Sequence, residues 1–446
     1  MKKSLIITLL LGAAACVPAQ AQAQTAEEKP LVAVHADTTG YNRFRFGGYG
    51  EMLAQFMDYG INRFAGTATG NTKTHRNSIS IPRFVLAFDY KFNQKWILGA
   101  EIEFEAGGVG SAVEIENSEN GEYETEIEKG GEVALEQFHI TRLIVPQFNV
   151  RAGHLIVPVG LTNAHHEPIN FFGPSRPQAE TSLLPSTWHE TGIELFGSFG
   201  RRFTRFDYQL MVVAGLNANG FDRNEWIIGG KAGYFETDNF TSPGYVARVD
   251  YSGVPGLRTG VSFYYCRDAG SNSDKEQTYA SISRIPVAIG TWDAQYRNPY
   301  VTARANLTYG YVGNSAALSE INRRLSNNSP YSRLIPIAKN ALSYGVEAGL
   351  NLASVIGKGC PTIYPFARYE YYNPQCRGEG KQLMDKRLEV SQWQVGLNWF
   401  ALPNLVVKGS YINRQIGTAK VFGKGPYNSE NEFAIGIAYV GWFIRK

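Results

Sequence analysis

Seven titratable side chains are concentrated in one stretch, Leu161–Glu190, and they are His165, His166, Glu167, Arg176, Glu180, His189 and Glu190. Imidazole, carboxylate and guanidinium groups in one segment can set the charge of a narrow passage, bind a metal ion or catalyse hydrolysis. The spacing of these residues and the elements that hold them decide among these chemistries.

Metal binding and hydrolysis are both weakly supported by the spacing. The adjacent His165, His166 and Glu167 lack a further ligand at a spacing typical of metal sites, so no metal site is predicted. Ser186, His189 and Glu190 could supply a nucleophile and a base, but no nucleophile-elbow glycines surround Ser186. An enzyme is therefore the less favoured interpretation.

The stretch is predicted to be a long, folded loop. Pro168, Pro174, Pro177 and Pro185 exclude a long helix or a central strand. Its apolar residues favour burial rather than disorder, and they are Ile169, Phe171, Phe172, Leu183, Leu184 and Trp188. Strand-like runs flank it at 149–160 and 191–200. We interpret it as a loop that folds back into a wide barrel and narrows it; a packed surface loop is the alternative.

An alternation of apolar and polar residues repeats from Tyr41 to the end of the chain. In 301–311, for example, Ala303, Ala305, Leu307 and Tyr309 alternate with Arg304, Asn306 and Thr308. Period-two alternation indicates strands with one apolar face, here strands of about 10–13 residues. Aromatic residues make up 13% of the chain and cluster near strand ends, as in the interfacial girdles of membrane barrels.

Connections between the predicted strands alternate between short and long. The short turns are expected at 93–95, 146–147, 200–203, 255–256, 298–299, 357–361 and 403–404. The long loops are expected at 61–79, 106–131, 161–190, 222–243, 268–286, 313–340, 375–389 and 418–431. Eight loops and seven turns predict an all-β fold, a transmembrane antiparallel β-barrel of about 16 strands whose third extracellular loop folds inward.

The N-terminus predicts export from the cytoplasm, and the bulk charge bears on nucleic-acid binding. Residues 1–23 are predicted to be a signal peptide, 24–42 a flexible periplasmic lead-in, and 43–446 a single barrel domain. Cys16 leaves open a lipid-modified cysteine. Removal of Lys2 and Lys3 with the signal peptide lowers the net charge from +3 to +1, which does not favour nucleic-acid binding. After the N-terminus no apolar run reaches about 18 residues, so no spanning helix is predicted.

Two further features leave alternatives open. Cys360 and Cys376 would bracket one extended strand and lie too far apart to bond, whereas a Cys266–Cys376 disulfide is possible. The loop 106–131 is rich in Glu and Gly; it is either a solvated acidic loop or a Ca²⁺ site beside lipopolysaccharide.

Charged residues on the polar faces of the strands are expected to line a lumen. The candidates are Arg45, Arg83, Lys91, Glu101, Glu103, Arg248, Arg258, Arg304, Arg368 and Lys408. Acids on the same faces, such as Asp250 and Glu347, nearly balance the bases. Because a pore selects ions with a ring of one charge sign, a strongly anion-selective lumen is not predicted.

The order of motifs from Gly153 to Gly192 resembles the phosphate-selective porin O and P family. The matching residues are Pro158, Gly160, His166, Pro168, Arg176, Pro177, Pro185, Trp188, Glu190 and Gly192. The resemblance implies a 16-stranded, usually homotrimeric outer-membrane porin with no cofactor, whose third loop constricts the pore. The seven titratable residues are then candidates for that constriction.

A passive diffusion channel for small hydrophilic solutes or ions, with anions such as phosphate among them, is the function this predicts. Its partners would be outer-membrane lipid, lipopolysaccharide and the permeating solutes. The alternatives are an outer-membrane barrel hydrolase and a surface binding protein on a barrel scaffold. The latter would need a large external domain, and the longest predicted loops have only about 30 residues.

Overall fold

The computed structural model describes residues 43–61, 73–105, 112–117, 123–128, 132–201, 204–231, 238, 240–273, 278–325, 333–417 and 429–445. The predicted signal peptide (1–23) and lead-in (24–42) lie outside these residues. No helix among the described residues is long and apolar enough to cross a membrane.

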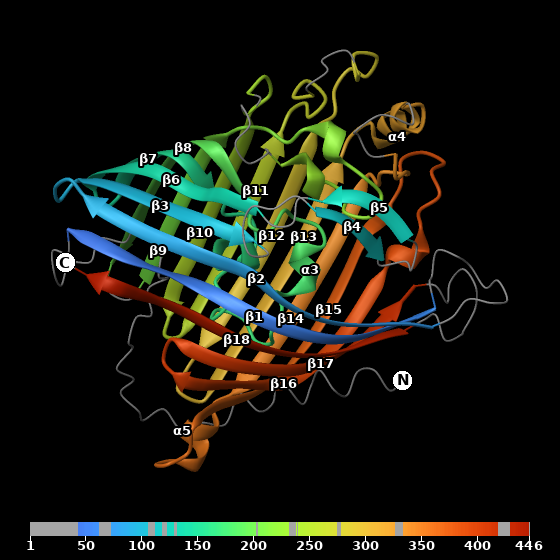
Figure 1. The fold of residues 1–446 in the computed structure, drawn as a ribbon. Helices are drawn as coiled ribbons and strands as arrows, with labels where there is room; N and C mark the ends of the chain where they lie inside the picture. The colour runs from blue at the N-terminus through green and yellow to red at the C-terminus, as the bar shows by residue number, and fades with distance from the viewer. Residues whose placement is uncertain are drawn as a thin grey trace.

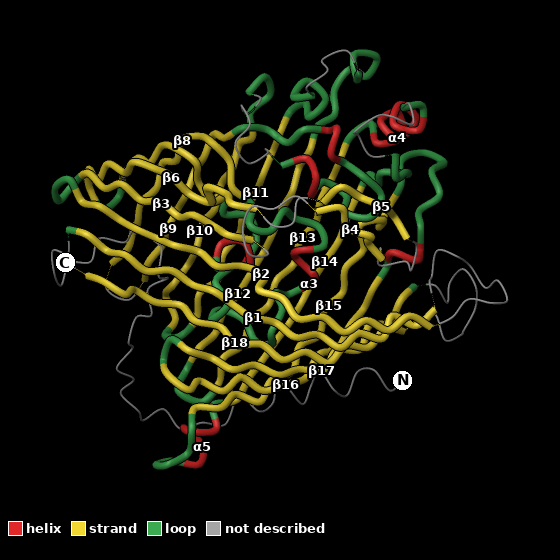
Figure 2. The backbone as a smooth tube through the Cα atoms, viewed as in Figure 1, coloured by secondary structure: helices red, strands yellow, loops and turns green. Residues whose placement is uncertain are grey.

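Sixteen antiparallel strands in this part of the chain form a closed barrel (Figures 1 and 2). They are β1 (Phe44–Ile61), β2 (Lys73–Lys91), β3 (Trp96–Glu105), β6 (Glu132–Val145), β7 (Phe148–Ile156), β8 (His189–Arg201), β9 (Thr204–Val213), β10 (Gly244–Val254), β11 (Leu257–Cys266), β12 (Val287–Arg297), β13 (Val301–Val312), β14 (Asn340–Leu350), β15 (Thr362–Arg377), β16 (Val390–Leu402), β17 (Leu405–Ile416) and β18 (Ser429–Arg445). The first and last strands pair with each other, with Tyr49 opposite Val440, and so close the ring. The predicted fold class and strand number are confirmed.

The alternation of long and short connections is also confirmed, although several expected bounds were wrong. β2 begins at Lys73, inside the expected loop 61–79, and β1, β2, β15 and β18 have 16–19 residues rather than 10–13. The residues added at the ends of these strands are mostly polar, as in 73–77 of β2 and 429–432 of β18, so the strands continue beyond the apolar length that spans a bilayer. The turn expected at 357–361 is a longer connection, 351–361, whose first part is a short helix, α5 (Leu352–Ile356).

Several loops contain structure of their own. The acidic stretch 106–131 forms a two-stranded hairpin, β4 (Ala112–Asn117) and β5 (Tyr123–Glu128), rather than a plain loop. The side chains of this hairpin lie outside the described residues. The alternative of a Ca²⁺ site in 106–131 therefore stays a prediction. The other elements are α2 (Leu161–Ala164), α3 (Gln178–Thr181), α4 (Ser315–Arg323), η1 (Ala218–Gly220), η2 (Ile228–Gly230) and η3 (Lys386–Leu388).

The two faces of the barrel differ as the alternation predicts. One cross-strand row consists of Val249, Val261, Trp292, Leu307 and Tyr344, and each of these side chains is 38–55% exposed on the outside. The adjacent row, Arg248, Ser262, Thr291, Thr308 and Ser343, is buried on the inside. In a membrane barrel the apolar row faces lipid.

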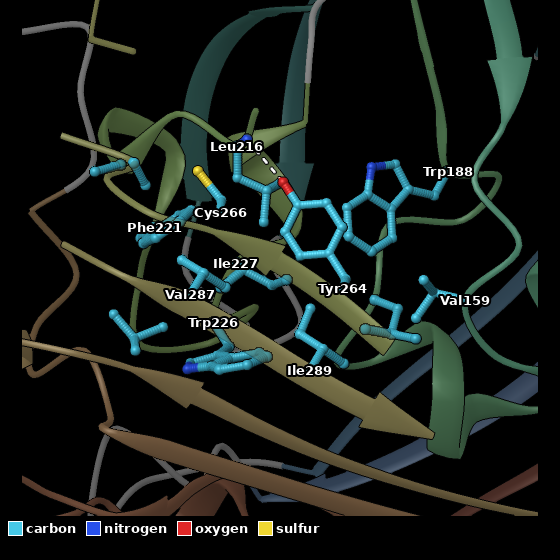
Figure 3. Packing of buried hydrophobic residues seen from close by; sticks show 14 of the residues in the cluster. Val159, Trp188, Leu216, Phe221, Trp226, Ile227, Tyr264, Cys266, Val287 and Ile289 are labelled. Carbon is cyan, nitrogen blue, oxygen red and sulfur yellow. Dashed lines mark hydrogen bonds between the residues drawn. The ribbon is translucent and has the colours of Figure 1, made fainter. Parts of the chain in front are cut away.

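The inside is not uniformly polar, which corrects the expectation of a hydrophilic inner face. An apolar cluster joins inward side chains of β11 and β12, such as Tyr264 and Ile289, to the loops over them (Figure 3). Trp188 packs on Tyr264 with ring centroids 4.7 Å apart, and the Tyr264 hydroxyl accepts a hydrogen bond from the Leu216 backbone N–H (3.1 Å). Strand alternation identifies the inward side chains but not the loop segments that cover them.

The three cysteines of the described chain, Cys266, Cys360 and Cys376, are free thiols. The disulfide left open between Cys266 and Cys376 is therefore not formed. Cys360 and Cys376 lie before and near the end of β15, as expected for residues that bracket one strand.

We predict that Val261→Arg, halfway along β11, destabilises the folded barrel in lipid vesicles by about 2–4 kcal/mol, because the cation would face hydrocarbon. The same change at Val254, at the turn end of β10, should cost only about 0–1 kcal/mol. Urea unfolding of the vesicle-inserted protein measures both values. Equal costs at the two positions would contradict the assignment of the outer face to lipid.

Candidate pore constriction

Residues 157–188, here called the inner segment, connect β7 to β8 and contact strands around much of the barrel. The backbone N–H of Gly160 donates to Ser262 of β11 (3.2 Å), and that of Gly173 donates to Asn398 of β16 (3.1 Å). The Arg83 side chain of β2 donates to the carbonyl of His166 (3.1 Å). Because these strand residues are buried on the inner face of a closed ring, the segment lies within the barrel, where Figure 1 shows α3.

Glu180 holds the beginning of the inner segment in place. Its two carboxylate oxygens accept the backbone N–H groups of Leu161 and Asn163, both at 2.8 Å. They also occupy the space that a Cβ on Gly160 would need, and Gly160 has a φ of 89°, which favours glycine. Burial raises the pKa of Glu180, while the backbone N–H groups oppose that shift.

Apolar side chains anchor the rest of the segment. Phe172 stacks on Phe366 of β15 with ring centroids 5.2 Å apart. Leu183, Leu184 and Trp188 are fully buried in the apolar cluster of Figure 3. The prolines prevent regular structure, and only the four-residue helices α2 and α3 form. The segment is therefore packed along its length.

The predicted constriction residues separate into different environments. His165 contacts Arg258 and lines a small cavity, whereas His166 is turned toward Tyr49 (3.0 Å). Glu167 accepts a hydrogen bond from the amide of Asn170 (2.7 Å). Adjacent residues of the sequence thus point to different parts of the lumen.

Arg176 is half-buried and donates to the hydroxyls of Ser186 and Thr187, the latter at 3.0 Å. Its guanidinium remains close to several charged groups of β1–β3. Burial, followed by the neighbouring cation Arg83, lowers the pKa of Arg176 from its ordinary value. Arg176 is the one guanidinium among the seven predicted residues, and the carboxylates Glu103 and Glu51 act on it electrostatically.

His189 and Glu190 belong to the first two positions of β8 rather than to the loop. The ring of His189 lies against that of His154, with centroids 4.7 Å apart. Glu190 accepts a hydrogen bond from the Trp188 indole N–H (3.0 Å). Both side chains are almost completely buried, so they brace the end of the inner segment.

Acidic residues predominate on the inner face of β1, β2, β3 and β6, here called the acidic wall. It contains Glu51, Glu101, Glu103 and Glu136. Arg83 lies among these acids, with its guanidinium 3.3 Å from Glu103 and 3.7 Å from Glu51. Two more predicted pore-lining cations belong to the same strands: Arg45 of β1 is paired with Asp89, and Lys91 of β2 is largely buried.

Basic residues predominate on β13–β17, here called the basic wall. Arg304 and Arg368 share Glu347, with Arg368 at 2.6 Å, so two guanidinium groups meet one carboxylate. Lys408 donates to the carbonyls of Pro168 and Phe171 (3.0 Å for the latter). Arg304, Glu347 and Arg368 line a cavity of about 30 Å³ together with His165, Phe171 and Glu370.

A third set of charges joins the two walls. Arg248 of β10 bonds Asp250 (2.8 Å) and Asp293 (2.9 Å), and it also donates to the carbonyl of Gly160 (3.1 Å). Arg258 contacts Asp250 at 3.1 Å. The predicted pore-lining bases are thus mostly paired with acids or with carbonyls of the inner segment.

Several residues of the site were missing from the predicted set. Tyr49, Glu136 and Asp293 belong to ordinary alternating strands, and only the pairing of strands brings them to charged neighbours. Asn163 accepts from the Trp188 backbone N–H (2.5 Å) and so joins the ends of the segment. For Glu136 and Asp293, their position on the polar face of a strand could have indicated that they face the lumen. The sequence around Tyr49 gives no such indication.

The comparisons with known proteins find no family model that matches this chain. An uncharacterized protein of Aquifex aeolicus (strain VF5) is 32% identical over 140 residues, or 31% of this chain. The match spans only 28% of that relative's length.

Similar solved structures are outer-membrane proteins. OmpF of Salmonella typhi, in complex with daunomycin, has a TM-score of 0.50 and 12% identity, with 90% of this chain and 98% of that chain covered. The outer-membrane channel DcaP of Acinetobacter baumannii scores 0.48 at 12% identity, covering 89% and 97%. An anion-selective porin from Comamonas acidovorans scores 0.47 at 10%, covering 89% and 99%. With its closed sixteen-stranded barrel and its likeness to OmpF, this chain has the fold of an outer-membrane porin.

Proposed function

We propose that the protein is a passive outer-membrane channel for small hydrophilic solutes, narrowed by the inner segment and crossed by a transverse electric field. The observation that supports this proposal is the placement of the acidic and basic walls. In the ring of sixteen strands the two walls occupy different arcs: β3 and β13 are eight strands apart, and β18 separates β1 from β17 where the walls come nearest. The inner segment bonds to strands of both walls, so solutes would pass beside it between charges of opposite sign.

The mixed charges favour a general path over strict phosphate selection. The resemblance to phosphate-selective porins concerns the inner segment, but Glu347 is shared between Arg304 and Arg368 and reduces their joint charge. A field between two walls orients polar solutes and leaves only a mild ion preference. The homotrimer implied by the same resemblance is part of the proposal, and chemical cross-linking in the membrane tests it.

The alternative functions have less support. Ser186 accepts a hydrogen bond from Arg176, while Glu190 accepts one from Trp188, so both are engaged in bracing the inner segment. Side chains engaged in these hydrogen bonds do not favour a hydrolase. A surface binding protein would need a large external domain, and the described outer elements are a hairpin and short helices.

Refolded protein in a planar lipid bilayer is expected to give stepwise, long-lived open channels, because the barrel is closed and its inner face carries charge. Single-channel recording measures this behaviour. Turnover of a lipid or peptide substrate without any conductance would instead support the hydrolase.

Arg176→Glu is expected to lower the preference for anions over cations, because it places a negative charge next to the acidic wall in a narrow passage. The measurement is the reversal potential across a salt gradient. Arg323→Glu is the matched control, because Arg323 lies exposed on α4 and pairs with Glu320. An unchanged reversal potential in Arg176→Glu would contradict the proposed position of this side chain.

Glu180→Gln is expected to raise the mean conductance and its fluctuations, because one charged acceptor of the Leu161 and Asn163 N–H groups is lost. Hydrogen bonds to charged groups contribute about 1.5–3 kcal/mol, enough to populate looser positions of the inner segment. Glu194→Gln is the control, because this buried carboxylate of β8 pairs with Arg151 of the neighbouring strand β7 (3.0 Å) and does not contact the inner segment through that pair. Identical recordings for the two variants would show that the inner segment does not limit the current.

A further inference from the structure

Three buried side chains meet where the inner segment touches the acidic wall. They are Glu101 of β3, Glu136 of β6 and His166 of the inner segment, and they are 1%, 0% and 5% exposed. One ligand atom from each lies within 4.8 Å of the other two. None of these contacts involves the basic wall. The cluster is therefore considered separately from the proposed channel.

With Glu136 ionised, the cluster has fewer hydrogen-bond donors than its acceptors need. Nδ1 of His166 lies 3.2 Å from the carbonyl oxygen of Asn163, which only accepts, so Nδ1 carries the proton of the neutral ring. The lone pair of Nε2 then faces Glu136 Oε1 at 3.2 Å and the Tyr49 hydroxyl at 3.0 Å. That hydroxyl also reaches Glu136 Oε2 at 2.9 Å, and it has only one proton to donate. Whichever acceptor receives it, two lone pairs remain in contact.

Glu101 adds a second, independent observation that points to a cation. Neither of its carboxylate oxygens has a hydrogen-bond partner among the described residues, although the side chain is buried. The amide of Gln137 approaches this carboxylate without reaching hydrogen-bond geometry. The nearby Arg83 is directed to Glu103, to Glu51 and to the carbonyl of His166. A buried carboxylate left in this way costs free energy unless it takes up a proton or binds a cation, and a cation would compensate Glu136 and Glu101 together.

We propose that Glu101, Glu136 and His166 form a binding site for a divalent transition-metal ion of the Zn²⁺ class. One imidazole nitrogen with two carboxylates is a donor set that suits Zn²⁺, whereas Ca²⁺ and Mg²⁺ prefer oxygen ligands alone. The hydrogen bond from Nδ1 of His166 to a backbone carbonyl is the usual support of a metal-ligating histidine.

The geometry requires only a small movement. Ligands about 2.0–2.2 Å from a tetrahedral ion lie about 3.4 Å from one another. His166 Nε2 and Glu136 Oε1 already have this separation, at 3.2 Å. The Glu101 carboxylate must move inward, and no hydrogen bond within the described structure holds it back. The ion would fasten the inner segment to β3 and β6.

The site was not predicted from the sequence because its ligands come from three distant segments. The histidine pair at 165–166 was noticed, but its neighbour Glu167 bonds Asn170 instead. Only the folding of the inner segment against the wall brings His166 to Glu101 and Glu136.

Zn²⁺ titration of the full-length protein, purified in detergent without a histidine tag and treated with a chelator, tests the proposal. Competition with a fluorescent chelator is expected to reveal one tightly bound Zn²⁺ per chain. His166→Gln and Glu101→Gln should each weaken that binding at least about tenfold, since loss of a supporting partner alone costs 10–100-fold. His139→Gln, which removes a buried imidazole of β6, and Glu194→Gln should leave it unchanged.

Absence of stoichiometric Zn²⁺ binding, or equal affinity in the wild type and both ligand variants, would overturn the proposal. If the ligand variants do not fold, X-ray absorption at the zinc edge of the loaded wild type decides. One imidazole nitrogen with carboxylate oxygens at about 2.0–2.2 Å supports the site, and a first shell without imidazole refutes it. These outcomes do not depend on whether the protein conducts ions.

Discussion

The structure depends on one constraint: backbone N–H and C=O groups in hydrocarbon must find their partners within the protein. A sheet meets this requirement only if it has no free edge, which here means that β1 must pair with β18. Closure in turn assigns the two faces of every strand. Val261 and Trp292 are exposed on the outside, and Ser262 and Thr291, one residue before or after them in the sequence, are buried inside.

A ring of this size encloses more space than its own inward side chains fill, and the inner segment occupies part of it. The segment cannot form ladders of its own, because prolines interrupt it. Its backbone groups are satisfied instead by side chains, such as Glu180 and Asn398, and its carbonyls accept from Arg83, Arg368 and Lys408. The charged residues of the wall therefore hold the segment as well as face the lumen.

Charge inside the barrel is balanced locally and separated across the ring. Arg248 and Arg258 balance Asp250 and Asp293, and Arg304 with Arg368 exceeds Glu347 by one charge. In the acidic wall, Glu101 and Glu136 contribute to an excess of acids over cations, and this excess motivates both the transverse field and the proposed metal site. One arrangement of charge thus supports both proposals, at different places in the lumen.

The sequence by itself determined the barrel, its sixteen strands and most of the short turns, because period-two alternation and turn residues are local properties of the chain. A membrane makes the alternation regular, since one face of every strand must be apolar. It also identified the inner segment, from its prolines, apolar residues and titratable groups. Tertiary structure alone decided which charges meet. His165 and His166 are adjacent in sequence yet contact Arg258 and Tyr49, which belong to distant strands. Partners of this kind are set by strand register and by loop packing, and neither leaves a local pattern in the chain.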